Sequence, residues 1–255
     1  MSRRWQGILK GESPLALGER VGRRLFSLVP AQLRCRFCNA PFRGRYAGPF
    51  GLVGYTPSRK NPTICERCIE RAPEGGALVP VSVLFADVRG YTSLAETMSS
   101  VETTALLHRF YRAASSALLA HDAILGQIAG DEVMAIFVPG LAGSSYPRHA
   151  VQAASALLRG VGYGTPAGSW LEVGVGICTG EEYVGNVGGG GFKDFTAIGD
   201  ITNTAARLQA SAAGGEILTC SVTYAAVASI YPRAEPLSLQ LKGKRSSVES
   251  FRIRV

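Results

Sequence analysis

The stretch Val81-Ser-Val-Leu-Phe-Ala-Asp87 is β-branched and apolar up to its last residue, which is an aspartate. A short apolar run of this kind predicts a buried strand. The residues that follow, Val88-Arg-Gly-Tyr-Thr92, place a glycine directly after the strand, so we expect a tight turn into a helix. Backbone N–H groups at the start of such a helix are able to bind phosphate.

Downstream of this strand, the apolar residues follow helical and strand periodicities in alternation. Gly130-Asp131 is a turn-like pair typical of a hairpin, and Asp200 is a candidate N-cap for a helix that closes at Gly214-Gly215. Because hairpins occur among the alternating elements, we expect an α+β (α/β sandwich) fold rather than pure βαβ winding. The expected helices are Ser100 to His121, Arg148 to Leu158 and Thr202 to Ala213; the expected strands are Ile124 to Gln127, Val133 to Val138, Leu171 to Ile177, Tyr183 to Val187, Phe195 to Ile198 and Glu216 to Cys220, with a hairpin about Gly243 within Leu237 to Val255.

The composition indicates a globular protein. The chain of 255 residues is 46% hydrophobic and 18% charged, which predicts a packed core and excludes a largely disordered protein. No apolar stretch approaches the roughly 20 residues of a membrane-spanning helix. Met1 to Lys10 lacks the apolar region of a signal peptide, so we expect a cytoplasmic protein. The net charge of +8 suits an anionic ligand such as a nucleotide, nucleic acid or lipid headgroup, and equally suits plain solubility.

Composition and hydrophobic periodicity divide the chain into three parts. The periodic region is set off by a boundary near residues 72–79. Residues 1–34 are basic and intermittently apolar, residues 35–75 are rich in Gly, Pro and Arg, and periodic patterns fill residues 79–255. Within the first part, Glu19 to Pro30 has an amphipathic helical pattern that would suit an anionic membrane surface. Such segments more often pack on their own domain or on a partner helix, and we expect the same here.

Four of the six cysteines form two Cys-x-x-Cys pairs, which are Cys35 with Cys38 and Cys65 with Cys68. Without an export signal, a metal site is favoured over disulfides, and paired thiolates suit a structural, tetrahedral Zn²⁺. An iron–sulfur cluster and redox-active thiols are the alternatives. Nearby cations would offset the charge of a Zn²⁺ ion with four thiolates, and they show no aromatic or helical pattern that would indicate nucleic-acid binding; they are Arg36, Arg43, Arg45, Lys60, Arg67 and Arg71.

Asp87 and Asp131 form a candidate catalytic pair. One ends the apolar strand and the other occupies the tip of the expected hairpin. If hairpin and strand are neighbours, the two carboxylates could share divalent cations, because Mg²⁺ typically binds one or two carboxylates together with substrate phosphates. Aspartates at strand ends and turns are common, so the pair alone does not decide the function.

Five motifs occur in order through residues 79–255, and together they resemble the catalytic domain of the class III nucleotidyl cyclases, the adenylate and guanylate cyclase family. The region from Cys35 through Cys68 is similar to a cysteine-rich module of some bacterial members. The resemblance implies a ferredoxin-like βααββαβ core and a head-to-tail homodimer with its sites at the interface. The motifs are Phe85-Ala-Asp-Val-Arg-Gly-Tyr-Thr92, Gly130-Asp-Glu-Val-Met-Ala135, Gly174-Val-Gly-Ile-Cys-Thr-Gly180, Ala197-Ile-Gly-Asp-Ile-Thr-Asn-Thr-Ala-Ala-Arg207 and Leu241-Lys-Gly-Lys244.

From this resemblance, we expect the chain to convert ATP to 3′,5′-cyclic AMP and pyrophosphate. Two Mg²⁺ or Mn²⁺ ions held by Asp87, Asp131 and the carbonyl of Val88 would activate the ribose 3′-hydroxyl for attack on the α-phosphate. Asn203 and Arg207, four residues apart on one helix face, match the residues that orient the ribose and stabilise charge on the α-phosphate. The expected phosphate-binding residues are Gly90, Tyr91 and Thr92 at the turn, and Lys242 for the terminal phosphates.

The base-binding positions depart from the commonest pattern of this family. Where an adenine-selecting lysine is usual, this chain has Gln127, whose amide can pair with either adenine or guanine. Thr196 at the partner position resembles the variant of bacterial adenylate cyclases, so we expect ATP as the substrate. A guanylate cyclase, and an inactive cyclase-fold module for dimerisation or nucleotide sensing, are the alternatives. Cys178 replaces the usual histidine of its motif and, like Cys220, is expected in the core.

Overall fold

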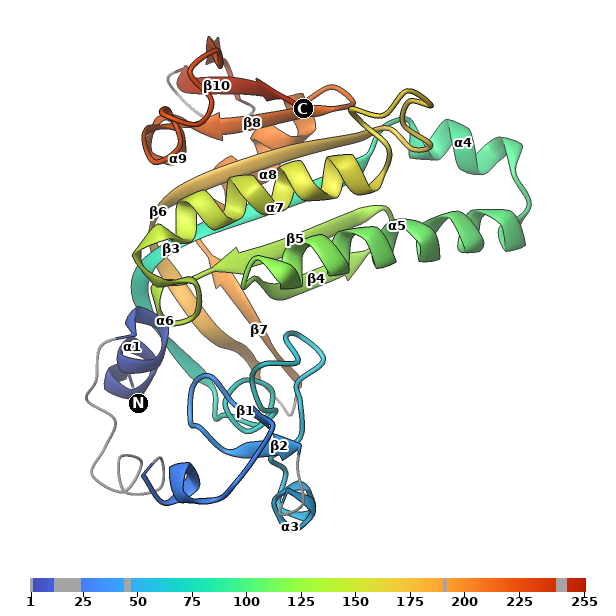
Figure 1. Cartoon of the computed structure of the whole chain (residues 1–255). Coiled ribbons are helices and arrows are strands. Elements are labelled where there is room, and N and C mark those ends of the chain that lie inside the picture. The colour runs from blue at the N-terminus through green and yellow to red at the C-terminus, as the bar shows by residue number, and fades with distance from the viewer. Residues whose placement is uncertain (1, 12–23, 44–46, 190–191, 242–246) are drawn as a thin grey trace.

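The structure is a computed structural model, and it describes residues 2–11, 24–43, 47–189, 192–241 and 247–255. Its main sheet has the strand order β4-β5-β3-β6-β8-β10-β9 with β7 paired to β6, and β1 and β2 form a separate small sheet (Figure 1). The helices are α1 (Ser2–Lys10), α3 (Gly48–Leu52), α4 (Tyr91–Thr97), α5 (Ser100–Ala120), α6 (Pro139–Ala142), α7 (Tyr146–Gly160), α8 (Asp200–Ser211) and α9 (Ser221–Ala225), with a 3₁₀ turn at Gly143–Ser145; the strands are β1 (Leu33–Arg34), β2 (Pro41–Arg43), β3 (Gly75–Val88), β4 (Ile124–Ala129), β5 (Glu132–Phe137), β6 (Val173–Gly189), β7 (Phe192–Ile198), β8 (Glu216–Cys220), β9 (Glu235–Leu239) and β10 (Val248–Arg254).

The expected α+β fold and its ferredoxin-like core are confirmed. The order β3-α4-α5-β4-β5-α7-β6 along the chain gives the strand order β4-β5-β3-β6 in the sheet, with β3 antiparallel to both of its neighbours. The long strands β3 and β6 run through the centre of the molecule, and α5 and α7 lie side by side on one face of the sheet (Figure 1).

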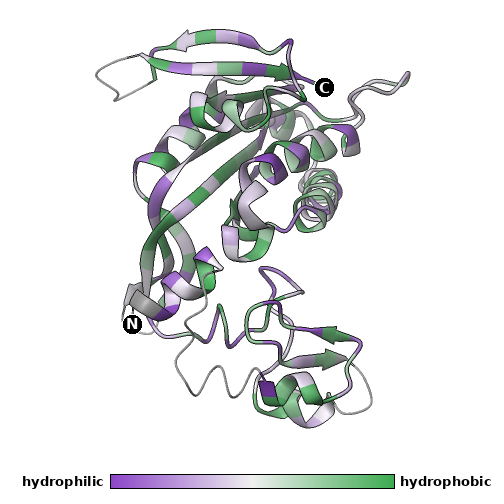
Figure 2. Ribbon diagram, turned by 60° about the vertical axis from the view of Figure 1, so that its left-hand side comes forward, coloured by the Kyte–Doolittle hydropathy of each residue, from purple (hydrophilic) through white to green (hydrophobic). Residues whose placement is uncertain are grey.

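Both faces of β3 are buried, which explains its continuous apolar sequence. Leu84 and Ala86 pack with α5 and α7 in one core cluster. Val81 and Val83, which alternate with them, belong to a second cluster that contains apolar residues of α8. Figure 2 shows apolar residues concentrated along these central strands. The sheet therefore separates two cores, and the end of β3 lies between the helices of both faces.

The expected elements are found, with corrected boundaries. The strand expected at Val81 to Asp87 is part of the longer β3, because β3 pairs with β6 over its whole length. The two strands expected at Leu171 to Ile177 and Tyr183 to Val187 are one continuous strand, β6. The C-terminal hairpin is present as β9 and β10, while its expected turn at Gly243 lies outside the described residues.

Helix α8 corrects the expected cap. Its N-cap is Gly199 rather than Asp200, which is the first helical residue, and the helix ends at Ser211. One N–H group of its first turn is satisfied from another element, because the buried carboxylate of Glu182 on β6 accepts hydrogen bonds from Thr202 N and Oγ1. A non-local carboxylate thus does the work of a local cap.

The N-terminal part packs directly on the sheet. Helix α1 contacts β3, and the ring of Trp5 lies 5.8 Å from that of Phe195 on β7. Trp5 and the cysteine region share one buried cluster with β3. Residues 19–23 of the amphipathic segment expected at Glu19 to Pro30 lie outside the described residues, and residues 24–28 are helical. Phe26 of this helix packs on the chain's own core, against the rings of Phe50 and Tyr55. Among the described helices, none is both long and apolar enough to cross a bilayer.

Candidate active site

The carboxylates of Asp87 and Asp131 come together at one end of the sheet. Asp87 is paired in register with Glu132 across β3 and β5, and Asp131 directly precedes Glu132 in the hairpin turn. The N–H of Val88 donates to the main-chain oxygen of Asp131 at 3.3 Å. Burial, together with the hydrogen bond and charge of Asp131, raises the pKa of Asp87 to about 6. The expected juxtaposition of the two carboxyl groups is therefore present.

Two residues that were not expected at the site also contact Asp87. The guanidinium of Arg89 forms an ion pair with Asp87 Oδ2, and Gln209 Nε2 on α8 donates to the same oxygen at 3.1 Å. Both contacts oppose the rise in the pKa of Asp87. The spacing of Arg89 could have indicated its role, since residues two apart in an extended chain share a side. No sequence signal pointed to Gln209.

The turn after β3 has the expected form. Gly90 has φ +67°, in the left-handed region that favours glycine, and it precedes α4 as the N-cap residue. Tyr91 and Thr92 are the first residues of α4, so all three expected phosphate-binding residues follow Asp87 closely in space and sequence. The hydroxyl of Tyr111 on α5 donates to the Gly130 carbonyl, which anchors the hairpin that carries Asp131. Tyr111 is a further residue that sequence reasoning missed.

Helix α8 presents Asn203 and Arg207 away from the sheet. Thr204, Ala205, Leu208 and Gln209 form its buried side. Asn203 is exposed and Arg207 is half-buried. The helix lies very close to β6 because Gly176 has no side chain: a Cβ there would lie 2.1 Å from Gln209 N. The glycine of this motif thus sets the depth at which α8 sits.

The expected base-binding residues lie on two strands that approach each other, β4 and β7. Gln127 is exposed and lines a cavity of about 560 Å³, together with Asp194 and Phe195 of β7. Thr196 is half-buried and follows Phe195, but it is not among the residues described as lining this cavity. The structure therefore brings the two strands together, with Gln127 rather than Thr196 at the cavity wall.

The two groups of expected catalytic residues do not meet within one chain. In the described part of the protein, no hydrogen bond or ion pair joins Asp87 or Asp131 to Asn203 or Arg207. Lys242, expected at the terminal phosphates, lies outside the described residues.

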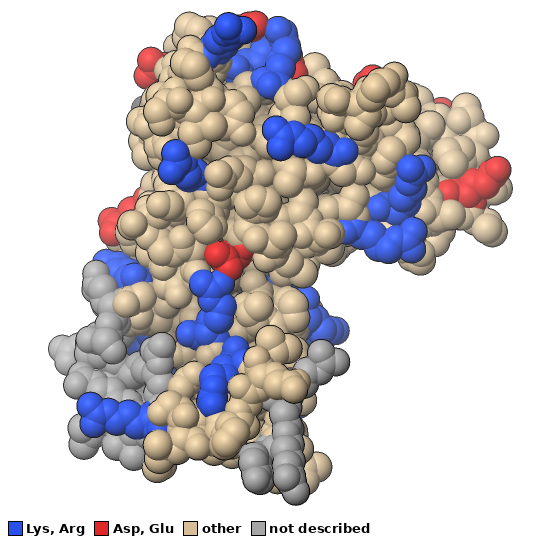
Figure 3. All heavy atoms as spheres, in the orientation of Figure 1, with Lys and Arg blue, Asp and Glu red and all other residues tan. Residues whose placement is uncertain are grey.

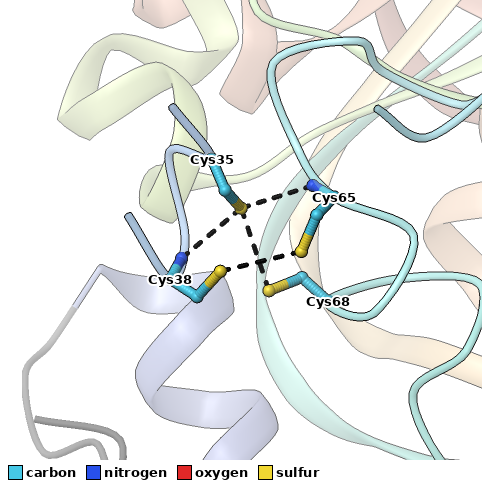
Figure 4. A group of neighbouring side chains, drawn as sticks. All are labelled: Cys35, Cys38, Cys65 and Cys68. Atoms are coloured by element: carbon cyan, nitrogen blue, oxygen red, sulfur yellow. Dashed lines mark hydrogen bonds between the residues drawn. The ribbon is translucent and has the colours of Figure 1, made fainter. Parts of the chain in front are cut away.

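The four paired cysteines form one compact cluster, with their sulfur atoms all within 4.8 Å of one another (Figure 4). Four thiolates around Zn²⁺ at about 2.3 Å in a tetrahedron would lie about 3.8 Å apart. The Sγ atoms of Cys35 and Cys68 are 3.9 Å apart, and those of Cys38 and Cys65 are 3.6 Å apart. The sulfur geometry fits a tetrahedral Zn²⁺ site.

Backbone N–H groups complete the cluster. Those of Cys38 and Cys65 donate to Cys35 Sγ at 3.4 and 3.3 Å. Hydrogen bonds, the largest from Cys38, hold the pKa of Cys35 well below its ordinary value. Several of the surrounding cations form ion pairs with carboxylates. These pairs are Arg36 with Asp122, Arg71 with Glu66 and Lys60 with Asp194. Arg45 lies outside the described residues.

Comparison with known proteins connects these features to one family. Residues 77–254 match the family model described as the adenylate and guanylate cyclase catalytic domain. The chain is 28% identical over 205 residues to the uncharacterised protein Rv1319c of Mycobacterium tuberculosis, covering 80% of this chain and 36% of that protein. It is 31% identical over 134 residues to adenylate cyclase 1 of Rhizobium meliloti, covering 51% of this chain and 20% of that protein. The chain thus spans about a third or less of the length of these relatives.

Solved cyclases share the fold. The adenylyl cyclase CyaB from P. aeruginosa superposes with a TM-score of 0.61 at 28% identity, covering 69% of this chain and 93% of that one. The guanylyl cyclase Cya2 superposes with a TM-score of 0.61 at 25% identity, covering 70% and 93%. The aspartate pair, the hairpin and α8 all fall in the matched region. This chain belongs to the adenylate and guanylate cyclase catalytic-domain family.

Proposed function

We propose that the chain converts ATP to 3′,5′-cyclic AMP and pyrophosphate, at sites shared between two copies of the chain. The observation that carries this proposal is the meeting of Asp87 and Asp131 at the end of β3. Two carboxyl groups held this close together provide the hard oxygen donors that a divalent cation binds.

Two Mg²⁺ or Mn²⁺ ions would be held by the carboxylates of Asp87 and Asp131 and the carbonyl of Val88. All of these are hard oxygen donors, which such cations prefer. When bound, the ions would activate the ribose 3′-hydroxyl and neutralise charge on the α-phosphate. The residues of the chain keep the carboxylates in position, since Arg89 and Gln209 hold Asp87 and Tyr111 holds the hairpin.

A second copy would supply Asn203 and Arg207 to each site. Asn203 and Arg207 lie outside the buried side of α8, so they would be available to orient a ribose and stabilise the α-phosphate held by the other copy. A row of exposed apolar side chains supports contact between copies: Leu78 is paired in register with Tyr183, and Tyr183 with Ile198. These three are 52%, 39% and 51% exposed, and Thr196 lies on the same face as Ile198.

Thr196 and Gln127 would contact the base. The amide of Gln127 can donate to N1 and accept from N6 of adenine, and when flipped it can pair with guanine. Thr196 favours adenine by its likeness to bacterial adenylate cyclases. For the cysteine cluster we propose a structural Zn²⁺ ion, on the evidence of the sulfur distances.

Pyrophosphate release tests the enzymatic proposal. ATP and GTP are supplied separately, each with Mg²⁺ or Mn²⁺, and Asp131→Ala serves as the inactive control. We expect release from ATP that exceeds release from GTP and that disappears in the control. Release from GTP alone would identify a guanylate cyclase, and release from neither nucleotide would leave an inactive module that binds nucleotide or dimerises.

A further inference from the structure

The side chain of Lys60 in the cysteine region contacts both of the predicted base-binding strands, β4 and β7. Its ammonium group donates to the carbonyl of Gly126 at 2.5 Å and pairs with Asp194 Oδ1 at 2.7 Å. Gly126 directly precedes Gln127, and Asp194 lies two residues before Thr196. The side chain of Lys60 is only 16% exposed, so this contact is largely shielded from water. One half-buried cation therefore links β4 to β7 beside both residues expected to contact the base.

The same loop also pairs with the edge of the sheet. The carbonyl of Lys60 accepts a hydrogen bond from Leu125 N at 2.9 Å, and Asn61 Nδ2 donates to the Ala123 carbonyl at 2.7 Å. β4 is the outermost strand on this side of the sheet. Its free edge is thus covered by residues of the cysteine region, which fix the position of β4 where it leads into Gln127.

β4 is irregular at this point. Its register with β5 shifts between Leu125 and Gln127. Such a bulge turns the following side chain to a new direction and leaves the extra residue without a partner in the ladder. Here the carbonyl of the extra residue, Gly126, accepts the hydrogen bond from Lys60. Lys60 therefore stabilises the local backbone geometry that sets where Gln127 points.

The position of the Lys60 loop depends in turn on the cysteine cluster. Arg36, next to Cys35, donates its N–H to the Thr63 carbonyl, and a β-bridge joins Pro57 to Cys65. On the other side of the cluster, buried Asn186 on β6 donates to the carbonyls of Ile69 and Ala72, which follow Cys68. Figure 3 shows Lys and Arg side chains on this N-terminal part of the molecule as well as over the rest of the visible face. The cluster thus closes the base of the loop that reaches β4.

A cavity of about 560 Å³ lies beside these contacts, between the loop and the sheet, and it is lined by both Lys60 and Gln127. We propose that Lys60 is a positioning residue for base recognition: by holding Gly126 and Asp194, it orients Gln127 and couples the metal state of the cysteine cluster to nucleotide affinity and selectivity. This inference rests on the proposed cyclase function for its kinetic consequences. Its structural consequence, that the cluster holds β4 and β7 in place, is independent of turnover.

The kinetic test compares three variants. Lys60→Met removes the ammonium group, Lys60→Arg keeps a cation, and Arg71→Met removes an ion pair internal to the cysteine region, with Glu66 at 2.9 Å. We expect Lys60→Met to raise KM for ATP about tenfold and to change the ATP-to-GTP ratio of kcat/KM, with kcat changed less than about threefold. Lys60→Arg should recover most of the loss, and Arg71→Met should behave as wild type. An unchanged Lys60→Met, or an equal effect of Arg71→Met, would overturn the proposal.

The structural test uses the unmodified protein. Metal is removed with a chelator and then restored with Zn²⁺. At each step, backbone hydrogen exchange is measured in strands β4 and β7 and, for comparison, in the distant strands β8 and β10. We expect faster exchange in the cysteine region and in β4 and β7, without a change in β8 and β10, and we expect Zn²⁺ to reverse it. Unchanged exchange in β4 and β7, or equal loss of protection in β8 and β10, would contradict the coupling. If the wild type shows no cyclase activity while exchange behaves as expected, the proposed function fails and the coupling stands.

Discussion

At the scale of single residues, Asp87 is held where its charged form is disfavoured. Burial and Asp131 raise its pKa from an ordinary 3.8 to about 6. Between these values the native protein binds more protons than the unfolded chain, so the contribution of this group to the free energy of unfolding falls as pH rises through that interval. Above pH 6 the two carboxylates repel each other unless a cation lies between them. The site is therefore arranged at a cost in stability that metal binding would offset.

Asp131→Asn tests this directly, because it removes the repelling charge and keeps the shape of the side chain. Without metal at pH 7, we expect the variant to be more stable than the wild type by about 1 kcal/mol, and the difference to disappear near pH 4. Mn²⁺ should raise the melting temperature of the wild type and not that of the variant, and turnover should fall at least about 100-fold. Urea and thermal unfolding followed by circular dichroism give the stabilities. A variant less stable than the wild type at pH 7 would contradict the repulsion.

The sequence predicted this residue pair and missed its neighbours for a physical reason. Asp87 and Asp131 each end a local pattern, a buried strand and a hairpin, and adjacent strands bring such ends together. Gln209 reaches Asp87, and Lys60 reaches Gly126 beside the expected base-binding residue Gln127, through packing between elements far apart in the chain. No sequence spacing indicates such contacts. Local periodicity therefore identifies groups that terminate elements, and not those that packing adds.

At the scale of elements, the seating of α8 depends on Gly176. A Cβ at this position would lie 2.1 Å from Gln209 N and 2.3 Å from Ala205 O, both backbone atoms that cannot move without the helix. Gly176→Ala should push α8 from β6 and lower the free energy of unfolding by about 2–3 kcal/mol. Because α8 carries Asn203 and Arg207, kcat should fall as well.

Gly160→Ala is the matched control for this change. Gly160 ends α7, and its Cβ would lie at an ordinary 3.7 Å from the Cβ of Ala113. We expect it to be neutral or to stabilise the protein by up to about 1 kcal/mol, since alanine favours helix. Urea denaturation of both variants decides the matter, and equal effects would show that α8 has room to adjust.

The cysteine cluster is an element whose stability is expected to come from its metal. Cys65→Ser should lower the zinc content from about one ion per chain to nearly none, and lower the melting temperature by several degrees. Cys220→Ser is the control, because Cys220 is also buried but lies on β8 outside the cluster. Elemental analysis of the purified proteins measures the metal. Iron in place of zinc, or equal zinc in both variants, would contradict the proposed ion.

Strand boundaries show where local reasoning on elements ends. The polar pair Glu181-Glu182 interrupts the apolar pattern of β6, which is why two strands were expected there. The strand nevertheless continues, because β3 supplies ladder partners on one side throughout and Glu182 caps α8 instead of facing solvent. The start of α8 was misassigned for the same reason. A cap from a distant strand replaced the local one that Asp200 would have provided.

At the scale of the whole molecule, the N-terminal part and the sheet form one body. The cluster of buried residues that begins at Trp5 continues through Cys35 and Cys65 to Val81 on β3. Figure 1 shows α1 and the small sheet at the end of the long strands β3 and β6, away from α4. The cysteine region therefore packs near the start of β3, while the aspartate pair lies at the other end of that strand. Gln127 lies between them in position, since it pairs with Met134, which pairs with Phe85 two residues before Asp87.

If each active site takes its aspartates from one copy of the chain and Asn203 and Arg207 from the other, mixed dimers should regain a definite fraction of the activity. Asp87→Ala and Arg207→Ala should each be inactive alone, because each removes one half of both shared sites. An equal mixture forms about half heterodimers, and each of these has one intact site of two, so activity should return to about a quarter of the wild-type value. Mixing Asp87→Ala with Asp131→Ala is the control, since both changes fall in the same half and no intact site can form. Rescue in the first mixture and not in the second, measured as pyrophosphate release after refolding the chains together, requires a site built from two copies; absence of rescue in both would place the whole site within one chain.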